Sequence, residues 1–227
     1  MNHATFQSTR WTLVQRVGPL SEAGARAMTE LCEIYYKPVH QFILYRIRDD
    51  QRAEDLTHSF FAQMLEKNSL GTPDPERGKY RTYLLGAVKY FLSAQHAQET
   101  AKKRGGDLEK VKLDDSIFDE DNHRSFDHDW ALALIARAHN YLHQEMVSAG
   151  KERQFEVLKL WLDGGSEGDS SEAAEKLGLS ANAFKVAVHR LRSKFRQAVY
   201  DEIAATTLFP EEIDEEFSHL IGVLAEQ

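Results

Sequence analysis

The stretch that decides the fold is SSEAAEKLGLSANAFKVAVHRLRSKFRQAV, which runs from Ser170 to Val199. Its first part predicts a short helix that Ser170 or Ser171 can cap. Gly178 follows where a tight turn needs a left-handed backbone, and Ser180 can then cap a second helix. A short helix, a glycine turn and a capped longer helix together predict a helix-turn-helix.

The second helix of this motif has one apolar and one basic face. Its apolar residues recur at spacings of four and three, which places them on one core-facing stripe: Phe184, Val188, Leu191, Phe195 and Val199. A parallel polar stripe lies about 100° around the helix and contains Lys185, His189, Arg192 and Arg196, with Asn182 and Arg190 beside it. Basic outer faces are common on surface helices, but the turn and cap ahead of this one favour a helix that enters a DNA major groove.

Outward from this motif the pattern stays helical. Apolar residues recur at three- and four-residue steps, and no run of strand-like alternation bounded by turns is found. The fold class is therefore predicted to be all-α. Pro38 is expected to kink or break a helix that begins near Glu22, and Asp49 or Asp50 to cap the next one. Further helices are expected over 80–103, 130–147 and 152–162.

Charge is distributed very unevenly along the 227 residues. The chain has 28 Lys and Arg against 36 Asp and Glu, a net charge of −8 that by itself argues against a nucleic-acid partner. Residues 76–104 and 180–200 nevertheless each carry +5, whereas 107–129 carry −6 and 201–227 carry −8. The acidic tail alone accounts for the net charge, which therefore conceals two basic segments.

These shifts in composition predict two helical domains joined by an acidic linker. The expected boundaries are an N-terminal helical extension over 1–21, a first domain over 22–104, a linker over 105–129, a second domain over 130–204 and an acidic C-terminal extension over 205–227.

Several classes of protein are disfavoured by composition. The single cysteine, Cys32, can form neither an internal disulfide nor a thiolate zinc cluster. With no leader and no long apolar run, we expect a cytoplasmic protein without membrane insertion. The linker holds acids and histidines whose side chains could bind a cation: Asp119, Asp121, His123, Asp127, His128 and Asp129. It lacks the glycine and terminal glutamate of an EF-hand loop, so no metal site is predicted there. No cofactor and no catalytic residue are predicted either.

The basic segment around residue 80 differs from the helix-turn-helix because aromatic residues alternate with its cations. Aromatic faces beside cations suit unstacked bases of single-stranded nucleic acid. The alternative is that the aromatics belong to the core of an amphipathic helix. We expect core positions for Leu84, Val88 and Phe91, whereas Tyr80 and Tyr90 remain open between the two interpretations.

Two further stretches carry a family resemblance. The sequences AEDLTHSFFAQMLEK (Ala53 to Lys67) and KYRTYLLGAVKYFL (Lys79 to Leu92) precede the helix-turn-helix. In this order they resemble a bacterial RNA polymerase sigma factor of the extracytoplasmic-function (ECF) group, and among these the longer variants of planctomycete-type genomes. The resemblance covers about Glu22 to Ala204.

The resemblance implies a sigma-2 domain over 22–104, a sigma-4 domain over 130–204, and core RNA polymerase and promoter DNA as partners. Contacts to the polymerase would involve its β′ clamp and β flap, with Glu54, Asp55, Phe60 and Phe61 as candidates on the clamp side. The minus-10 element would be read and opened by Lys89, Tyr90, His96, Lys102, Lys103 and Arg104. The minus-35 element would be read by Asn182, Lys185, His189, Arg190 and Arg192. RNA synthesis belongs to the polymerase, so this chain is not expected to be an enzyme.

The chain departs from the family pattern on its polymerase-facing helix and on its minus-10 reader. Arg52 stands where the family usually has Asp, His58-Ser59 stand where it usually has Gln-Glu, and Tyr90 stands where it often has Asn. One hypothesis is that a Ser/Thr kinase restores the missing charge by phosphorylating Thr57 or Ser59. An anti-sigma factor is the other regulator that the resemblance suggests.

The acidic tail supports a second hypothesis. Phe217, Leu220, Ile221 and Leu224 form a helical stripe among acids. Such a helix could pack on the sigma-4 domain and shield its basic face, or it could simply cap the fold. Two alternatives to the sigma factor remain: a DNA-binding regulator that acts without polymerase and, more distantly, a metal-dependent phosphoesterase.

Overall fold

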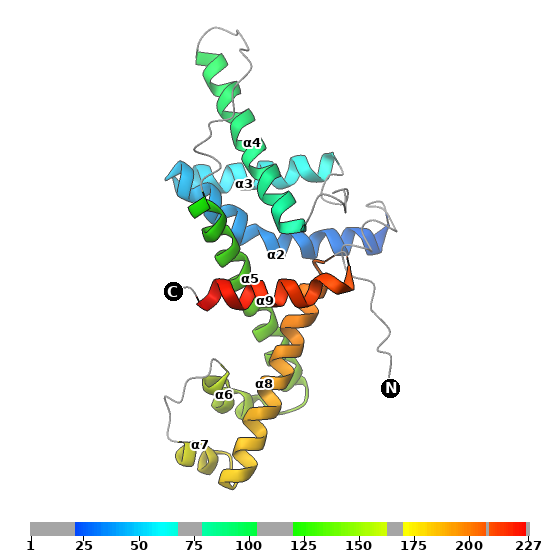
Figure 1. The fold of residues 1–227 in the computed structure, drawn as a ribbon, viewed down its shortest axis with the longest axis vertical. Coiled ribbons are helices and arrows are strands. Elements are labelled where there is room, and N and C mark those ends of the chain that lie inside the picture. Colours follow the sequence, from blue (N-terminus) through cyan, green and yellow to red (C-terminus); the bar gives the residue numbers. More distant parts are fainter. Residues whose placement is uncertain (1–20, 68–78, 104–119, 163–169, 208, 226–227) are drawn as a thin grey trace. The chain divides into compact units, whose positions relative to one another are not determined.

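The computed structural model describes residues 21–67, 79–103, 120–162, 170–207 and 209–225. Within these residues all regular structure is helical and no strand occurs (Figure 1). The predicted all-α fold class is therefore confirmed.

The chain forms two compact units. Unit 1 contains Met1–Ala133 together with Ala204–Gln227, and unit 2 contains Leu134–Ile203. The division falls inside helix α5 (Glu120–Ser148) and at the end of helix α8 (Ala181–Ala204). The C-terminal tail thus joins unit 1, although unit 2 precedes it in the chain.

Unit 1 begins with α2 (Glu22–Ile47), which Ser21 caps by accepting a hydrogen bond from the Gly24 amide at 2.9 Å. The break expected at Pro38 does not occur, because α2 runs through this residue. Proline removes one backbone hydrogen bond from a helix. Pro38 is buried on the same face of α2 as Tyr35, Val39 and Phe42, and we attribute the continuity of α2 to the packing of this face.

The core of unit 1 is completed by α3 (Asp50–Glu66) and α4 (Tyr80–Lys103). Asp49 caps α3 by accepting from the Arg52 amide at 3.1 Å, and α4 has the predicted bounds. Leu84, Val88 and Phe91 are buried, as expected for core positions. Other fully buried side chains of this core are Leu31, Ile34, Ile43, Ala53 and Phe60.

Helix α5 begins at Glu120, ten residues before the predicted start at Trp130. The last part of the expected acidic linker, 120–129, is therefore helical. The composition concealed this helix because Phe126 is the one apolar residue in that stretch. Phe126 is 1% exposed and its ring meets that of Phe42 edge-on at 6.2 Å, so tertiary packing supplies the stability that the acidic sequence lacks.

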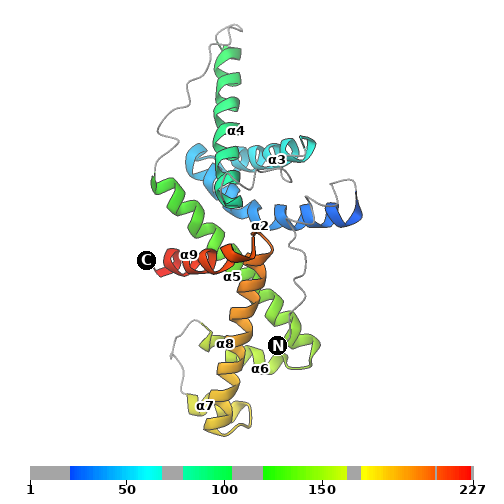
Figure 2. The same cartoon turned by 45° about the vertical axis from the view of Figure 1, so that its right-hand side comes forward.

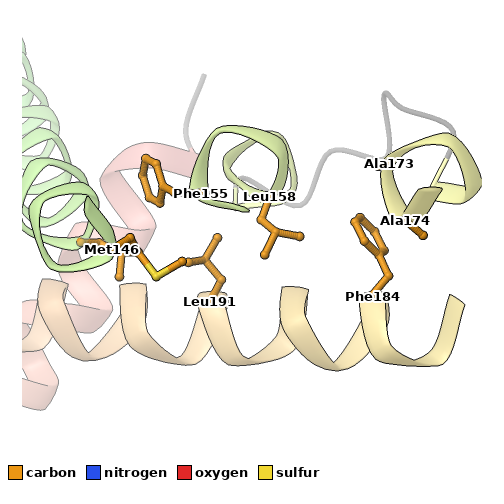
Figure 3. Close-up of a cluster of buried hydrophobic side chains, with 8 residues drawn as sticks. Met146, Phe155, Leu158, Ala173, Ala174, Phe184 and Leu191 are labelled. Carbon is orange, nitrogen blue, oxygen red and sulfur yellow. The ribbon is translucent and has the colours of Figure 1, made fainter. Parts of the chain in front are cut away.

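Unit 2 contains the rest of α5, α6 (Glu152–Leu158), a 3₁₀ turn (Lys159–Trp161), α7 (Ser170–Lys176) and most of α8. Its apolar core lies between these helices, as Figure 3 shows, and includes Met146, Phe155, Leu158, Ala174, Phe184 and Leu191. Gly178 has a φ of +64°, and the Ser180 hydroxyl accepts from the Ala183 amide at 3.2 Å. The predicted turn and cap of the helix-turn-helix are thereby confirmed.

The last helix, α9 (Ile213–Ala225), follows a 3₁₀ turn at Pro210–Glu212. It lies across the first half of α5 in both views (Figure 1, Figure 2). Of the apolar stripe predicted for the tail, Leu220 is fully buried within unit 1, Phe217 and Leu224 are half-buried, and Ile221 is exposed.

Candidate functional site

The first turns of α8 present a polar face to solvent. The side chains of all five residues predicted to read the minus-35 element are exposed: Asn182, Lys185, His189, Arg190 and Arg192. Phe184 and Leu191 bury the opposite side of the same turns, which fixes the rotation of the helix. In the described parts of the chain, Asn182, Lys185, His189 and Arg190 make no hydrogen bond or ion pair with their side chains. These four are free to bind a ligand.

The remaining cations of α8 contact this protein's own groups. Arg192 Nε donates to the Trp161 carbonyl oxygen at 2.7 Å, and Lys194 forms an ion pair with Glu145. The Arg196 guanidinium lies over the Tyr200 ring, 5.9 Å from its centroid. Arg192 therefore fastens α8 to the 3₁₀ turn, so the available part of the basic face is centred on the first three turns.

Helix α4 carries the residues predicted to bind the minus-10 element. Tyr90 is 69% exposed and His96 is also exposed, so both can contact a partner. Lys102 and Lys103 end the helix, and Arg104 lies outside the described residues. The question left open for the tyrosines is now answered: Tyr80 is buried edge-on against Tyr35 at 5.1 Å, whereas Tyr90 faces outward.

Lys89 does not fit the predicted role in DNA binding. Its side chain is 2% exposed, and Nζ lies 2.9 Å from Nε2 of His123 on α5. Burial lowers the pKa of Lys89, and the charge of Arg46 adds to this effect. Lys89 therefore joins α4 to α5 inside unit 1, which the sequence could not reveal because His123 was expected to lie in a linker.

Helix α3 presents the acids expected to contact polymerase. Glu54 and Asp55 are exposed, whereas Phe60 and Phe61 are buried and meet edge-on at 5.3 Å. The phenylalanines therefore anchor α3 beneath its polar surface and are not themselves available for contact. Arg52, the cation at a family acid position, pairs with Glu99 of α4 at 2.5 Å, which neutralises its charge.

The two residues proposed for phosphorylation differ in their exposure to solvent. Thr57 is 0% exposed, and its hydroxyl donates to the Ala53 carbonyl oxygen at 2.7 Å, so a kinase has no access to it in the folded chain. The prediction for Thr57 is therefore wrong. Ser59 is exposed, and its phosphorylation stays a prediction.

An aromatic and imidazole cluster beside these acids was missed by sequence reasoning. The Tyr36 hydroxyl lies 3.0 Å from His58 Nε2, and the Tyr36 ring stacks on His40 at 6.1 Å and on Phe61 at 6.0 Å. Tyr36 and His40 are four residues apart, so their shared face on α2 could be expected. Their contact with α3 could not, because it depends on how the two helices pack.

The tail helix is held by a network of charges that was also missed. Arg81 Nε donates to Glu216 at 3.0 Å, Arg81 Nη1 donates to Asp127 at 2.6 Å, and Lys79 pairs with Glu216 at 2.7 Å. His219 Nε2 lies 2.9 Å from Asp127, and the Arg81 guanidinium lies 5.2 Å from the centre of the Trp130 ring. Glu216 thus neutralises cations of unit 1, which favours the tail as a cap of this unit, whereas shielding of the helix-turn-helix by the tail stays a prediction.

No group of three His, Cys, Asp or Glu side chains gathers to form a metal site in the described ranges. Asp119 of the suggested cation cluster lies outside those ranges. None of the described helices has the length and apolar character needed to cross a membrane.

The fold and these surfaces define a helical DNA-binding protein with a helix-turn-helix in one unit and an aromatic and acidic surface in the other. The family model of the ECF sigma factors matches residues 17–201, and the chain belongs to that family. It therefore has the role of a sigma subunit in transcription initiation and is a transcription regulator, not an enzyme. Core RNA polymerase, promoter DNA and anti-sigma factors are the partners that the family implies. No curated protein and no solved structure matches the chain significantly.

Proposed function

We propose that this sigma subunit divides its contacts among three helices. Helix α3 binds the β′ clamp of core polymerase through Glu54 and Asp55. The second half of α4 binds the minus-10 element through Tyr90, His96 and the two lysines that end the helix, Lys102 and Lys103. Helix α8 binds the minus-35 element, and unit 2 also contacts the β flap.

The observation that carries this proposal is the available face of α8. Asn182, Lys185, His189 and Arg190 are exposed on consecutive turns and have no side-chain partner among the described residues. Amide, imidazole and guanidinium groups can read base edges, while ammonium and guanidinium groups neutralise phosphates. Residues 180–200 contain five cations and no acid, so this face attracts a polyanion despite the net charge of −8.

The test is transcription in vitro with core polymerase on genomic DNA, with the start sites mapped. The full chain should direct initiation from a defined set of start sites that core polymerase alone does not use. Absence of core-dependent initiation would reject the proposal. Duplex binding without initiation would instead indicate a DNA-binding regulator that acts without polymerase.

Paired variants test the assignment of helices. The double substitution K185A/R190A should lower initiation at mapped promoters by at least tenfold, because two contacts to DNA are lost. The control R26A/K37A removes the same charge from exposed residues of α2 and should leave initiation unchanged. Core binding should persist in K185A/R190A but weaken in E54K/D55K, for which E22K on α2 is the control.

A further inference from the structure

One apolar side chain interrupts the polar face of α8. Val186 is 49% exposed. The structure describes α8 over its whole length, and the other large apolar residues of this helix are buried or half-buried. The exposed position of Val186 is therefore not explained by the core of unit 2.

The neighbours of Val186 are the groups free to bind DNA. Asn182 lies one turn before it and Arg190 one turn after it, and residues at this spacing share a helix face. His189 lies three residues after Val186, and Lys185 directly precedes Val186 in the sequence. Val186 thus lies at the centre of the proposed reading face, not at its edge.

The small residues beside Val186 leave its methyl groups accessible. Ala183 is exposed and Ala187 is half-buried, so neither side chain extends beyond that of valine. A β-branched side chain has few rotamers on a helix, so little conformational entropy is lost when it is held against a ligand. Val186 is therefore a preorganised apolar contact among flexible polar ones.

In the major groove of DNA, the C5 methyl of thymine is the apolar group that side chains read. We propose that Val186 packs against the methyl group of one thymine in the minus-35 duplex and so selects thymine at that position. The inference rests on the proposed function, since it requires α8 to lie in the groove. It adds one specified base to a recognition sequence otherwise read by polar groups.

Val186 also borders an open groove of ≈ 490 Å³ beside α8, whose lining combines apolar residues such as Met146, Leu158 and Leu179 with polar ones such as Asn182 and Arg190. A segment of a protein partner is therefore the competing occupant. The polar neighbours favour DNA, because Asn182 and His189 have base-reading chemistry and the surrounding cations match phosphates. The two occupants predict different results in the experiment below.

The experiment compares thymine with deoxyuridine, which lacks only the methyl group. Duplexes that bind the full chain are selected from a randomised pool, and each thymine of the preferred sequence is then replaced singly by deoxyuridine. For the wild type, one replacement should weaken binding about fourfold, the loss expected for one buried methyl group. For Val186→Ala the same replacement should have no effect. The control Val147→Ala removes another exposed valine of unit 2 and should keep the wild-type response.

Three results would overturn the inference: selection of no duplex, equal binding of every thymine and deoxyuridine duplex, or an unchanged methyl effect in Val186→Ala. If Val186→Ala instead weakens binding to core polymerase while the methyl effect persists, the groove holds a protein segment. Core-dependent transcription does not require a methyl-sensitive position. Failure of this inference is therefore distinguishable from failure of the proposed function.

Discussion

At the residue scale, Arg81 is a cation buried within unit 1. Its side chain is 10% exposed and pairs with two carboxylates, Glu216 and Asp127. A buried charge is tolerated only when its partners compensate for the lost hydration. Arg81 therefore ties three helices, α4, α5 and α9, to a single position.

Replacing Arg81 by methionine should destabilise unit 1 by up to about 3 kcal/mol, because Glu216 and Asp127 would lose their shared cation and keep only Lys79 and His219 as partners. The matched control is Arg26→Met, which breaks the Arg26–Glu22 pair whose side chains are 64% and 86% exposed. Such an exposed pair is worth well under about 1 kcal/mol. Chemical denaturation of both variants measures the difference, and equal losses would contradict a structural role for the network.

The same network predicts how stability depends on pH. Burial raises the pKa of Glu216, but the hydrogen bonds and charges of Arg81 and Lys79 outweigh this and hold the pKa below its ordinary value of 4.5. A carboxyl group with a depressed pKa stabilises the fold above its unfolded pKa, and this stability is lost as the pH falls through the folded pKa.

Glu216→Gln should therefore be less stable than the wild type at pH 7, and the difference should shrink as the pH falls below about 4.5. Unfolding curves measured from pH 7 to pH 3 test this. Glu211→Gln, which alters an exposed acid of the same tail, is the control and should show no such convergence. A constant difference at every pH would mean that the charge of Glu216 is irrelevant.

At the scale of the element, α9 lies beyond the residues matched by the family and yet completes unit 1. Its buried residues, Glu216 and Leu220, combine an ion pair with apolar packing. The helix thus caps α4 and α5, which is one of the two roles that the sequence suggests for the tail, the other being to shield the helix-turn-helix.

Truncation after Thr206 should expose Trp130 and the Arg81 network, so amide hydrogen exchange should rise in α4 and in the first half of α5. The affinity for minus-35 duplex should stay within about twofold of the wild type, because the described contacts of α9 lie in unit 1. Truncation after Ala225 is the control. A marked rise in affinity would instead revive the idea that the tail shields DNA-binding residues.

At the scale of the whole molecule, the net charge of −8 does not determine what the protein binds. Charges farther apart than the Debye length, about 8 Å at physiological salt, are largely screened from one another. A duplex bound to α8 therefore responds chiefly to the charges close to its phosphates, which are the cations of that helix.

Duplex affinity should accordingly fall steeply as salt increases, with a logarithmic slope of about −0.9 for each phosphate contact. Lys185→Ala should reduce the magnitude of this slope by about 1 if Lys185 neutralises a phosphate. Lys37→Ala removes an equal charge from α2 and should leave the slope unchanged. A titration of affinity against salt for the three proteins decides the matter.

The sequence by itself determined the helix-turn-helix and the polar face of α8. Both follow from local rules: apolar spacing fixes which side is buried, Gly178 provides the turn, and Ser180 caps the helix. The exposed acids on α3 follow from the same rules, since a regular helix relates each residue to its neighbours at three and four positions. The outward position of Tyr90 does not, because the sequence is compatible with either a core or a surface place for this ring.

Tertiary structure alone decided the fate of Lys89, Thr57 and the acidic tail. Lys89 is buried beside His123 of α5, Thr57 is 0% exposed, and Glu216 of the tail is buried against Lys79 and Arg81. Periodicity encodes faces of single helices, whereas ion pairs such as Arg81–Glu216 join residues 135 positions apart. The reason is that burial of a polar group depends on a complementary partner, and only the folded chain brings that partner close.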